Sequence, residues 1–326
     1  MVHRLRNPSL LSIADLTRDE VQFLFRAAQS LSESFHRNET VPLLAGRTLA
    51  QLFFENSTRT RLSFETAIRR LGAGTLTFTA STSSLSKGES LLDTIRNLEA
   101  FRPDAFIVRH GASASVLHLA TKTNRPLINA GDGTREHPTQ ALLDAFTLQQ
   151  KWGTLEGKTV LILGDILHSR VARSNTRLLK LLGARVLYCG PGSLLPSNPA
   201  VLGADAATSQ IDSVLPEADA VMCLRIQRER QNSPTIPSLQ EYARFFGLTS
   251  ERAKRLKPDA WILHPGPVNR GVEVSPELAD GPSSLILEQV SNGVPMRMAI
   301  LAALLNPGGL ARHLDASPLS SGDSSS

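Results

Sequence analysis

The chain contains 326 residues, of which 41% are hydrophobic and 20% are charged, and its formal net charge is +5. This length indicates about two domains, and the composition excludes an intrinsically disordered chain. The longest apolar runs, such as residues 159–163 and 299–305, are too short to span a membrane. Because residues 1–7 are basic and polar and contain no apolar signal core, we expect a cytoplasmic protein.

The charge and the cysteine content narrow the classes of partner. Basic residues are spread along the chain with few aromatic residues among them, which argues against nucleic acid binding; a positive potential would also steer small anionic substrates, and charge alone does not decide between the two. Cys189 and Cys223 stand alone in the sequence, as expected for buried thiols rather than for a disulfide or a metal site. No cluster of His, Cys, Asp and Glu has metal-ligand spacing, and only Gly164 remains of a dinucleotide-binding fingerprint. We therefore expect neither a metal nor a cofactor.

The first half of the chain alternates short apolar runs with helical patterns. Strands are predicted over residues 49–54, 74–79, 104–108 and 127–130. Helices are predicted over residues 15–34, after residue 57, over residues 91–100, and from the His137-Pro-Thr-Gln140 segment onward, where a proline suits the first turn.

The second half repeats this alternation. Strands are predicted over residues 159–163, 185–189, 220–224 and 260–263, and helices over residues 171–182, 239–257 and 284–305. The fold class is therefore α/β, with two domains that are each a parallel sheet flanked by helices.

The polar segment 151–158, which holds two glycines, marks the expected domain boundary. We expect a first domain over residues 1–150, completed by a C-terminal helix (residues 285–306) that packs back on it. The second domain then covers residues 151–284, and the serine-rich tail, residues 312–326, is expected to be disordered.

The segment Ser57-Thr58-Arg59-Thr60-Arg61 lies where the first strand turns into a helix. The first turn of a helix has unpaired N–H groups and the positive end of the helix dipole, so it attracts an anion. Hydroxyl and guanidinium groups add further donors there. This pattern predicts a phosphate site, although a capped helix with solvated arginines fits the same local sequence.

Other polar side chains also follow predicted strands, where ligands bind in open α/β sheets. They are Arg109, His137, Arg170 and Arg225, and together with Thr60 they would line one cleft if the two sheets face each other. Such a site is rich in cationic and hydroxyl donors and poor in carboxylates. It suits a group transfer between two small anions, with donors for a developing oxyanion. Residues 80–90 form either a functional loop around Lys87 or a plain surface linker.

Six motifs occur here in the order in which they occur in one enzyme family. They are Ser57-Thr-Arg-Thr-Arg61, Lys87-Gly-Glu, Arg109-His110, His137-Pro-Thr-Gln140, Arg225-Ile-Gln227 and His264-Pro-Gly-Pro267. Over residues 8–306 the chain resembles the catalytic chain of aspartate carbamoyltransferases. The first and fourth motifs are shared by carbamoyltransferases in general, whereas the last two point to the aspartate branch.

The resemblance implies transfer of the carbamoyl group of carbamoyl phosphate to the amino group of L-aspartate, in de novo pyrimidine (UMP) biosynthesis. It implies a homotrimer with shared active sites, in which Ser83 and Lys87 enter from a neighbouring subunit. The carbamoyl phosphate-binding residues implied are Ser57, Thr58, Arg59, Thr60, Arg109, His137, Gln140, Ser83, Lys87, Gly266 and Pro267. Those implied for L-aspartate are Lys87, Arg170, Arg225 and Gln227, and the catalytic ones are Thr60, Arg109, His137 and Lys87.

Other functions stay open at this stage. A carbamoyltransferase for ornithine or another amine is disfavoured by Arg225 and Gln227, because ornithine needs an acidic partner for its second amine. A non-catalytic scaffold paralogue would have lost a motif residue, and an RNA-binding module would carry a binding motif. The sequence leaves open whether trimers assemble further with regulatory chains or dihydroorotase.

Overall fold

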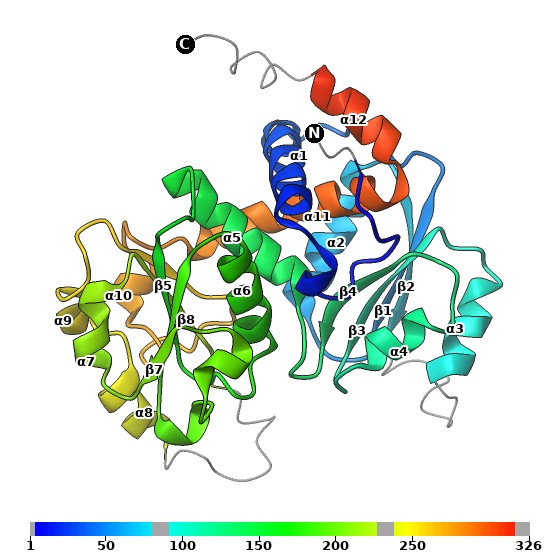
Figure 1. Cartoon of the computed structure of the whole chain (residues 1–326). Coiled ribbons are helices and arrows are strands. Elements are labelled where there is room, and N and C mark those ends of the chain that lie inside the picture. Colours follow the sequence, from blue (N-terminus) through cyan, green and yellow to red (C-terminus); the bar gives the residue numbers. More distant parts are fainter. Residues whose placement is uncertain (1–3, 80–90, 227–237, 317–326) are drawn as a thin grey trace. The chain divides into compact units, whose positions relative to one another are not determined.

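The computed structural model describes residues 4–79, 91–226 and 238–316 (Figure 1). The chain divides into two compact units. Unit 1 comprises Met1–Thr139 and Ser291–Ser326, and unit 2 comprises Gln140–Val290. No helix in the described ranges is long and apolar enough to cross a membrane.

Unit 1 is built on a parallel sheet whose strands lie in the order β2-β1-β3-β4. The strands are β1 (Thr48–Phe53), β2 (Gly74–Thr79), β3 (Ala105–His110) and β4 (Leu127–Asp132). Its helices are α1 (Arg18–His36), α2 (Thr58–Arg70), α3 (Leu91–Glu99), α4 (Ser115–Ala120) and α12 (Pro307–Asp315). Two further helices, α5 (Pro138–Trp152) and α11 (Ile286–Leu305), begin in one unit and end in the other.

Unit 2 has the parallel strand order β7-β6-β5-β8-β9. These strands are β5 (Thr159–Leu163), β6 (Arg185–Cys189), β7 (Ala206–Thr208), β8 (Ala220–Cys223) and β9 (Trp261–Leu263). Its helices are α6 (Arg170–Leu181), α7 (Ile211–Val214), α8 (Leu239–Phe246), α9 (Ser250–Ala253) and α10 (Pro276–Ala279).

Helices cover the sheet faces, which explains why the central strands read as continuous apolar runs. In unit 1, Ile95 of α3 and Val116 of α4 pack on Leu52 and Phe106. In unit 2, Ile211 of α7 packs on the sheet face that carries Leu161, while on α6 the Thr176 hydroxyl lies 2.7 Å from that of Tyr188 on β6. Both units therefore have the predicted α/β architecture.

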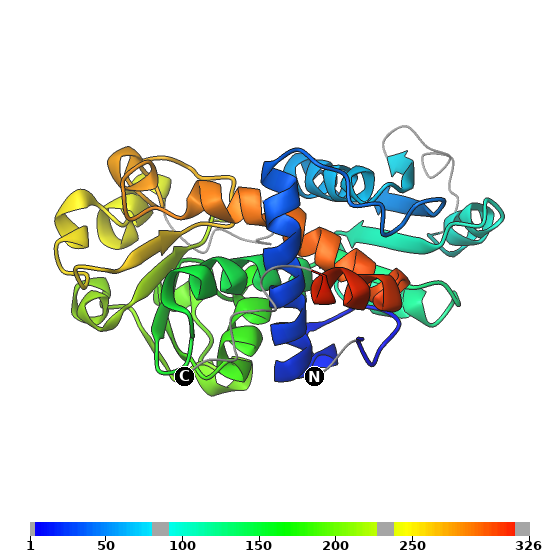
Figure 2. The ribbon, with the colours of Figure 1, turned by 90° about the horizontal axis from the view of Figure 1, so that it is seen from above.

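The C-terminal helices return to unit 1, as expected, and Figure 2 shows α12 beside α1. The Arg297 guanidinium on α11 donates to the Ser63 hydroxyl on α2 at 2.9 Å. The amide of Asn306, the N-cap of α12, donates to the Leu43 carbonyl at 2.7 Å.

Two sequence-based expectations need correction, and a third remains untested. Residues 312–315 are helical, because Asn306 and Pro307 start α12 with a cap and a favourable first residue, so the predicted disordered tail begins too early. The single helix predicted over residues 239–257 is two helices, since the chain is extended at Gly247. The predicted boundary between residues 150 and 151 lies inside α5, and the domain limits stay a prediction.

Candidate active site

The start of α2 has the chemistry of an anion site. Ser57 is the N-cap, and its side chain makes no capping hydrogen bond. Thr58 and Arg59 are exposed, whereas Thr60 is buried in the first turn. No acidic residue lies in that turn. The first backbone N–H groups of the helix therefore lie among hydroxyl and guanidinium donors, as a phosphate requires.

Arg109, at the end of β3, is held next to this helix start. It lies opposite Phe53 in the sheet, and its carbonyl accepts a hydrogen bond from the Phe54 N–H at 2.9 Å. Its Nη1 donates to the Ala130 carbonyl at 3.3 Å and lies 3.5 Å from Nε2 of His137. The carboxyl ends of β3 and β4 and the start of α5 thus meet at one point, and they bring together a guanidinium and an imidazole.

A carboxylate that the sequence did not single out also reaches Arg109. Oε1 of Glu55 lies 3.1 Å from Nη2 of Arg109, and both side chains are largely shielded from solvent. One carboxylate therefore lies among the cationic and hydroxyl donors at this position. An ion pair of this kind fixes the direction of the guanidinium.

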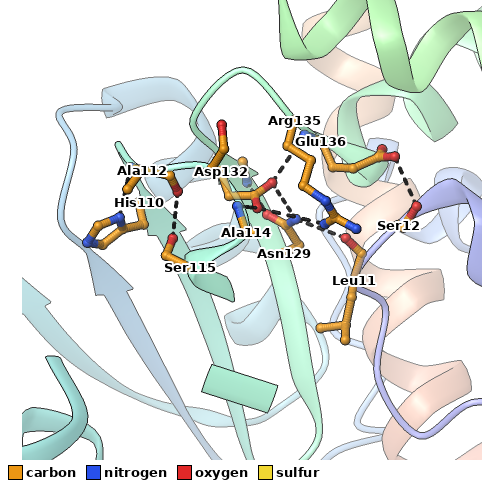
Figure 3. Close-up of polar contacts among 12 residues, drawn as sticks. Leu11, Ser12, His110, Ala112, Ala114, Ser115, Asn129, Asp132, Arg135 and Glu136 are labelled. Carbon is orange, nitrogen blue, oxygen red and sulfur yellow. Dashed lines mark hydrogen bonds and ion pairs between the residues drawn. The ribbon is translucent and has the colours of Figure 1, made fainter. Parts of the chain in front are cut away.

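Asp132, at the end of β4, organises the loop that leads to His137 (Figure 3). It is fully buried, and its Oδ1 accepts from the Asn129 amide at 3.0 Å and from the Glu136 N–H at 3.1 Å. Its Oδ2 accepts from the Ala114 N–H at 2.9 Å, in the segment after β3. One carboxylate therefore ties the segments that follow Arg109 to the residue before His137.

Two further contacts tighten this loop. Oε1 of the buried Glu136 accepts from the Ser12 hydroxyl at 2.9 Å (Figure 3). Gly133 has a φ of +47°, and a Cβ there would lie 2.3 Å from Oγ of Ser113, so no other residue fits without a shift. The segment that precedes His137 is thus fixed by buried hydrogen bonds and by the close approach at Gly133, as the support of a functional side chain should be.

In unit 2, Arg170 occupies the first position of α6 and is buried. Ser169 caps the helix by accepting from the Ala172 N–H. The turn before it is held by Asp165, which accepts from the His168 N–H at 3.1 Å and lies 2.8 Å from its ring Nδ1. His168 is therefore a partner of Asp165 in the turn that places Arg170.

Arg225 follows β8 and is half-buried. Gly164, at the end of the neighbouring strand β5, has a φ of +131°, and a Cβ there would lie 3.0 Å from the Leu224 carbonyl oxygen. Glycine therefore lets the segments that follow β5 and β8 approach each other closely.

The segment after β9 is joined to the end of β8 by Glu273, which is buried. Its carboxylate accepts from the Ile226 N–H at 3.2 Å and from the Asn269 N–H at 2.8 Å. Nδ1 of His264 accepts from the Gly266 N–H at 2.8 Å, so in neutral His264 the proton is on Nε2, which lies 3.8 Å from Oε2 of Glu273. The Gly266–Pro267 peptide bond is cis.

The other predicted site residues are distributed as follows. Gln140 is in the first turn of α5 and donates to Asp144 at 2.8 Å. Ser83, Lys87 and Gln227 lie outside the described residues.

The structure also bears on other chemistry. Burial raises the pKa of the Cys189 thiol to about 12 and also raises the pKa of Cys223, so neither is a thiolate nucleophile near neutral pH. In the parts of the chain that the structure describes, no three His, Cys, Asp or Glu side chains are arranged to hold a metal ion.

The residues that sequence reasoning missed are the supporting carboxylates Glu55, Asp132, Asp144 and Glu273. In a sequence, an isolated acidic residue cannot be told apart from an ordinary exposed one. The only local signal here is their position near a strand end or a motif residue: Asp132 is the last residue of β4, Glu55 lies two residues after β1, Asp144 four residues after Gln140, and Glu273 six residues after Pro267.

Family models match nearly the whole chain. Residues 8–150 match the carbamoyl-P binding domain, and residues 156–304 the Asp/Orn binding domain, of aspartate/ornithine carbamoyltransferases. The aspartate carbamoyltransferase catalytic subunit of Myxococcus xanthus is 55% identical over 292 residues, which cover 90% of this chain and 97% of that protein.

Solved structures give the same result. Aspartate transcarbamoylase from Trypanosoma cruzi in complex with N-(phosphonacetyl)-L-aspartic acid matches with a TM-score of 0.84 at 31% identity, covering 92% of this chain and 97% of that one. Its complex with carbamoyl phosphate and aspartate also matches with a TM-score of 0.84 at 31% identity, over 92% and 98% of the two chains. The fold, the residues at the strand ends and these matches agree, and the chain belongs to the aspartate/ornithine carbamoyltransferase family.

Proposed function

We propose that this protein is an aspartate carbamoyltransferase acting in de novo pyrimidine (UMP) biosynthesis. It transfers the carbamoyl group of carbamoyl phosphate to L-aspartate, giving N-carbamoyl-L-aspartate and phosphate. The observation that carries the proposal is the 3.5 Å approach of Arg109 Nη1 to His137 Nε2 beside the anion-binding start of α2. The relatives named above, which act on aspartate, support the choice of amine.

In this proposal the backbone and side chains of Ser57, Thr58, Arg59 and Thr60 hold the phosphate, together with Arg109. The carbonyl oxygen of the carbamoyl group accepts hydrogen bonds from Thr60, Arg109 and His137. The carbamoyl amine is held by Gln140 and by backbone carbonyls near Gly266 and Pro267. Arg170, Arg225 and Gln227 hold the two carboxylates of aspartate, because guanidinium groups bind carboxylates in a bidentate manner.

The reaction follows from these contacts. The neutral amine of aspartate attacks the carbonyl carbon, and the C–O bond to phosphate breaks as the new C–N bond forms. The amine loses one proton, which leaves on the phosphate, so that charge and atoms balance. Donors fixed around the carbonyl oxygen stabilise the negative charge that develops there, and binding orients two anions that otherwise repel each other.

The substrate assignment is tested by supplying carbamoyl phosphate with either aspartate or ornithine and measuring the carbamoylated product. Turnover with aspartate and none with ornithine is expected. Turnover with ornithine alone would identify the other branch of the family, and turnover with neither amine would identify a non-catalytic paralogue.

The role of His137 is tested by His137→Ala, with His118→Ala as a matched control, because His118 is exposed on α4 of the same unit. His137→Ala is expected to lower turnover by about 10- to 1,000-fold while phosphate binding survives. The control should keep wild-type turnover. Near-normal turnover in His137→Ala would remove His137 from the oxyanion site.

We further propose that the protein is a cytoplasmic homotrimer in which Ser83 and Lys87 act in the site of a neighbouring subunit. Light scattering should then give three times the chain mass of 35.3 kDa. Mixed trimers of Lys87→Ala and His137→Ala chains should regain activity, because some sites then contain both intact residues. Absence of recovery in confirmed mixed trimers would place Lys87 in the site of its own subunit.

A further inference from the structure

Asp144 on α5 is a buried carboxylate that accepts hydrogen bonds from three side-chain amides. Its Oδ1 accepts from Nε2 of Gln140 at 2.8 Å and from Nε2 of Gln289 at 2.7 Å. Its Oδ2 accepts from Nδ2 of Asn175 at 2.9 Å. All four side chains belong to unit 2, and Asp144 is fully buried.

This arrangement determines which end of each amide faces the carboxylate. An ionised carboxylate only accepts hydrogen bonds, so an amide next to it must direct its nitrogen toward it. The oxygen lies on the other branch of the planar amide group and is directed away. Because Gln140 and Asp144 are four residues apart on α5, the helix itself keeps the pair together.

For Gln289 the consequence is visible in the structure. While its Nε2 donates to Asp144, its Oε1 accepts from the His264 N–H at 2.9 Å. His264 is the first residue of the segment that contains Gly266 and Pro267, and its Nδ1 accepts from the Gly266 N–H at 2.8 Å. Asp144 thereby positions two things: the Gln140 side chain directly, and the backbone of this segment through Gln289.

We infer that Asp144 is a positioning residue that keeps Gln140 Oε1 turned toward the substrate, so that the enzyme selects an acyl phosphate whose acyl group carries N–H donors. This inference rests on the proposed role of Gln140 and of the backbone near Gly266 and Pro267. A carbamoyl group offers two N–H donors to these acceptors. An acetyl group has nearly the same shape, but its methyl group leaves the buried acceptors without a donor.

A site built to hydrogen-bond one group discriminates strongly against an analogue that lacks it, because the protein groups are then left unpaired. The selection depends on the orientation of Gln140. If the amide turned, Nε2 would face the carbamoyl N–H2 group, and two donors would meet.

The test uses Asp144→Asn and Asp144→Ala and compares carbamoyl phosphate with acetyl phosphate. In Asp144→Asn one oxygen becomes an N–H2 donor, and in Asp144→Ala both acceptors are lost, so Gln140 Oε1 is no longer held outward. The measured quantities are kcat/KM for carbamoyl phosphate with aspartate, and the inhibition constant of acetyl phosphate as a competitor. Thermal unfolding of each variant establishes that it is folded.

We expect the preference for carbamoyl over acetyl phosphate to fall at least about 10-fold in Asp144→Ala and less in Asp144→Asn. If Asp144→Ala does not fold, a drop of at least about 3-fold in Asp144→Asn still supports the inference. Equal losses for both acyl phosphates, or an unchanged preference in a folded variant, would overturn it.

Asp219→Asn is the control, because Asp219 is another aspartate of unit 2 whose carboxylate accepts a hydrogen bond; it is partly buried and accepts from the Thr159 N–H at 2.7 Å. It precedes β8, at the opposite edge of the sheet from Arg225, and should leave the preference unchanged. If the wild-type protein does not turn over carbamoyl phosphate with aspartate, the proposed function and this inference are overturned together. Wild-type turnover combined with an unchanged preference in the Asp144 variants overturns this inference alone.

Discussion

At the amino-terminal edge of each sheet, an aspartate before one strand is hydrogen-bonded to the threonine that starts the neighbouring strand. In unit 1, Asp104 precedes β3 and accepts from the Thr48 N–H at 2.8 Å and from Arg47 at 2.9 Å. In unit 2, Asp219 precedes β8 and accepts from the Thr159 N–H at 2.7 Å. Each aspartate also donates its own N–H to the carbonyl of that same threonine. We call each of these aspartates a clamp.

The carboxyl-terminal edges of the sheets differ. In unit 1, Asp132 accepts from the Ala114 N–H after β3, from the Asn129 side-chain amide on β4, and from the N–H of Glu136, the residue before His137. In unit 2 two carboxylates take part: Asp144 accepts from the Gln140 amide, and Glu273 accepts from the Ile226 N–H. The amino-terminal edges of the two sheets therefore have the same hydrogen bonds, whereas the carboxyl-terminal edges, where ligands bind in open α/β sheets, differ.

The largest effect is expected from removing the carboxylate of unit 1. Asp132→Ala leaves the Glu136 and Ala114 N–H groups without this acceptor and removes one of the two acceptors of the buried Asn129 amide, and should lower the free energy of unfolding by about 3 kcal/mol. Turnover should fall as well, because His137 loses its support. Denaturant unfolding and steady-state kinetics measure the two effects.

Asp93→Ala is the control for this change, since Asp93 is exposed on α3 and lies 3.8 Å from Arg96. Exposed ion pairs of this kind contribute little to stability, so the free energy of unfolding should change by less than about 0.5 kcal/mol. A similar loss for both variants would show that Asp132 does not organise the site.

The clamps should give smaller and equal effects in the two units. Asp104→Ala and Asp219→Ala each remove a partly exposed carboxylate that accepts from the N–H at the start of a strand, so each should cost about 1–2 kcal/mol. Scanning calorimetry should show a decrease of about 2–8 °C in the melting temperature. The KM values for both substrates should stay unchanged, and a rise in either KM would contradict the division between the two edges.

The smallest effect concerns pH. Burial raises the pKa of the Asp219 carboxyl, but hydrogen bonds from the Thr159 N–H and Lys257 outweigh burial and leave the pKa below its ordinary value of 3.8. Its contribution to stability is therefore complete above pH 3.8 and is lost as the pH falls through the lower pKa of the folded protein.

Melting curves of wild type and Asp219→Asn at several pH values measure this contribution. The stability difference between the two proteins should be constant from pH 7 to about 5 and should shrink as the pH falls below about 4. A difference that grows as the pH falls would have the wrong sign for a lowered pKa.

The sequence by itself determined the strands and the motif residues. Residues 74–79, 159–163 and 185–189 are strands as predicted, because short runs rich in β-branched and apolar residues fit only a strand between two helical layers. The positions of Arg109 at the end of β3 and of Arg225 after β8 could also be predicted from the sequence, and their roles in binding stay a prediction. The short helix α4 was missed, since its N-cap is Ala114 in a left-handed conformation, which gives no capping signal.

Tertiary structure alone decided what the buried carboxylates do. Asp132, Asp144 and Glu273 have no distinctive neighbours in the sequence, and their partners lie as far as 145 residues away, as for Asp144 and Gln289. A buried carboxylate is stable only where the fold supplies donors from several segments at once. In the proposed function the motifs specify which side chains meet the substrates, and long-range hydrogen bonds to these carboxylates orient the segments that carry them.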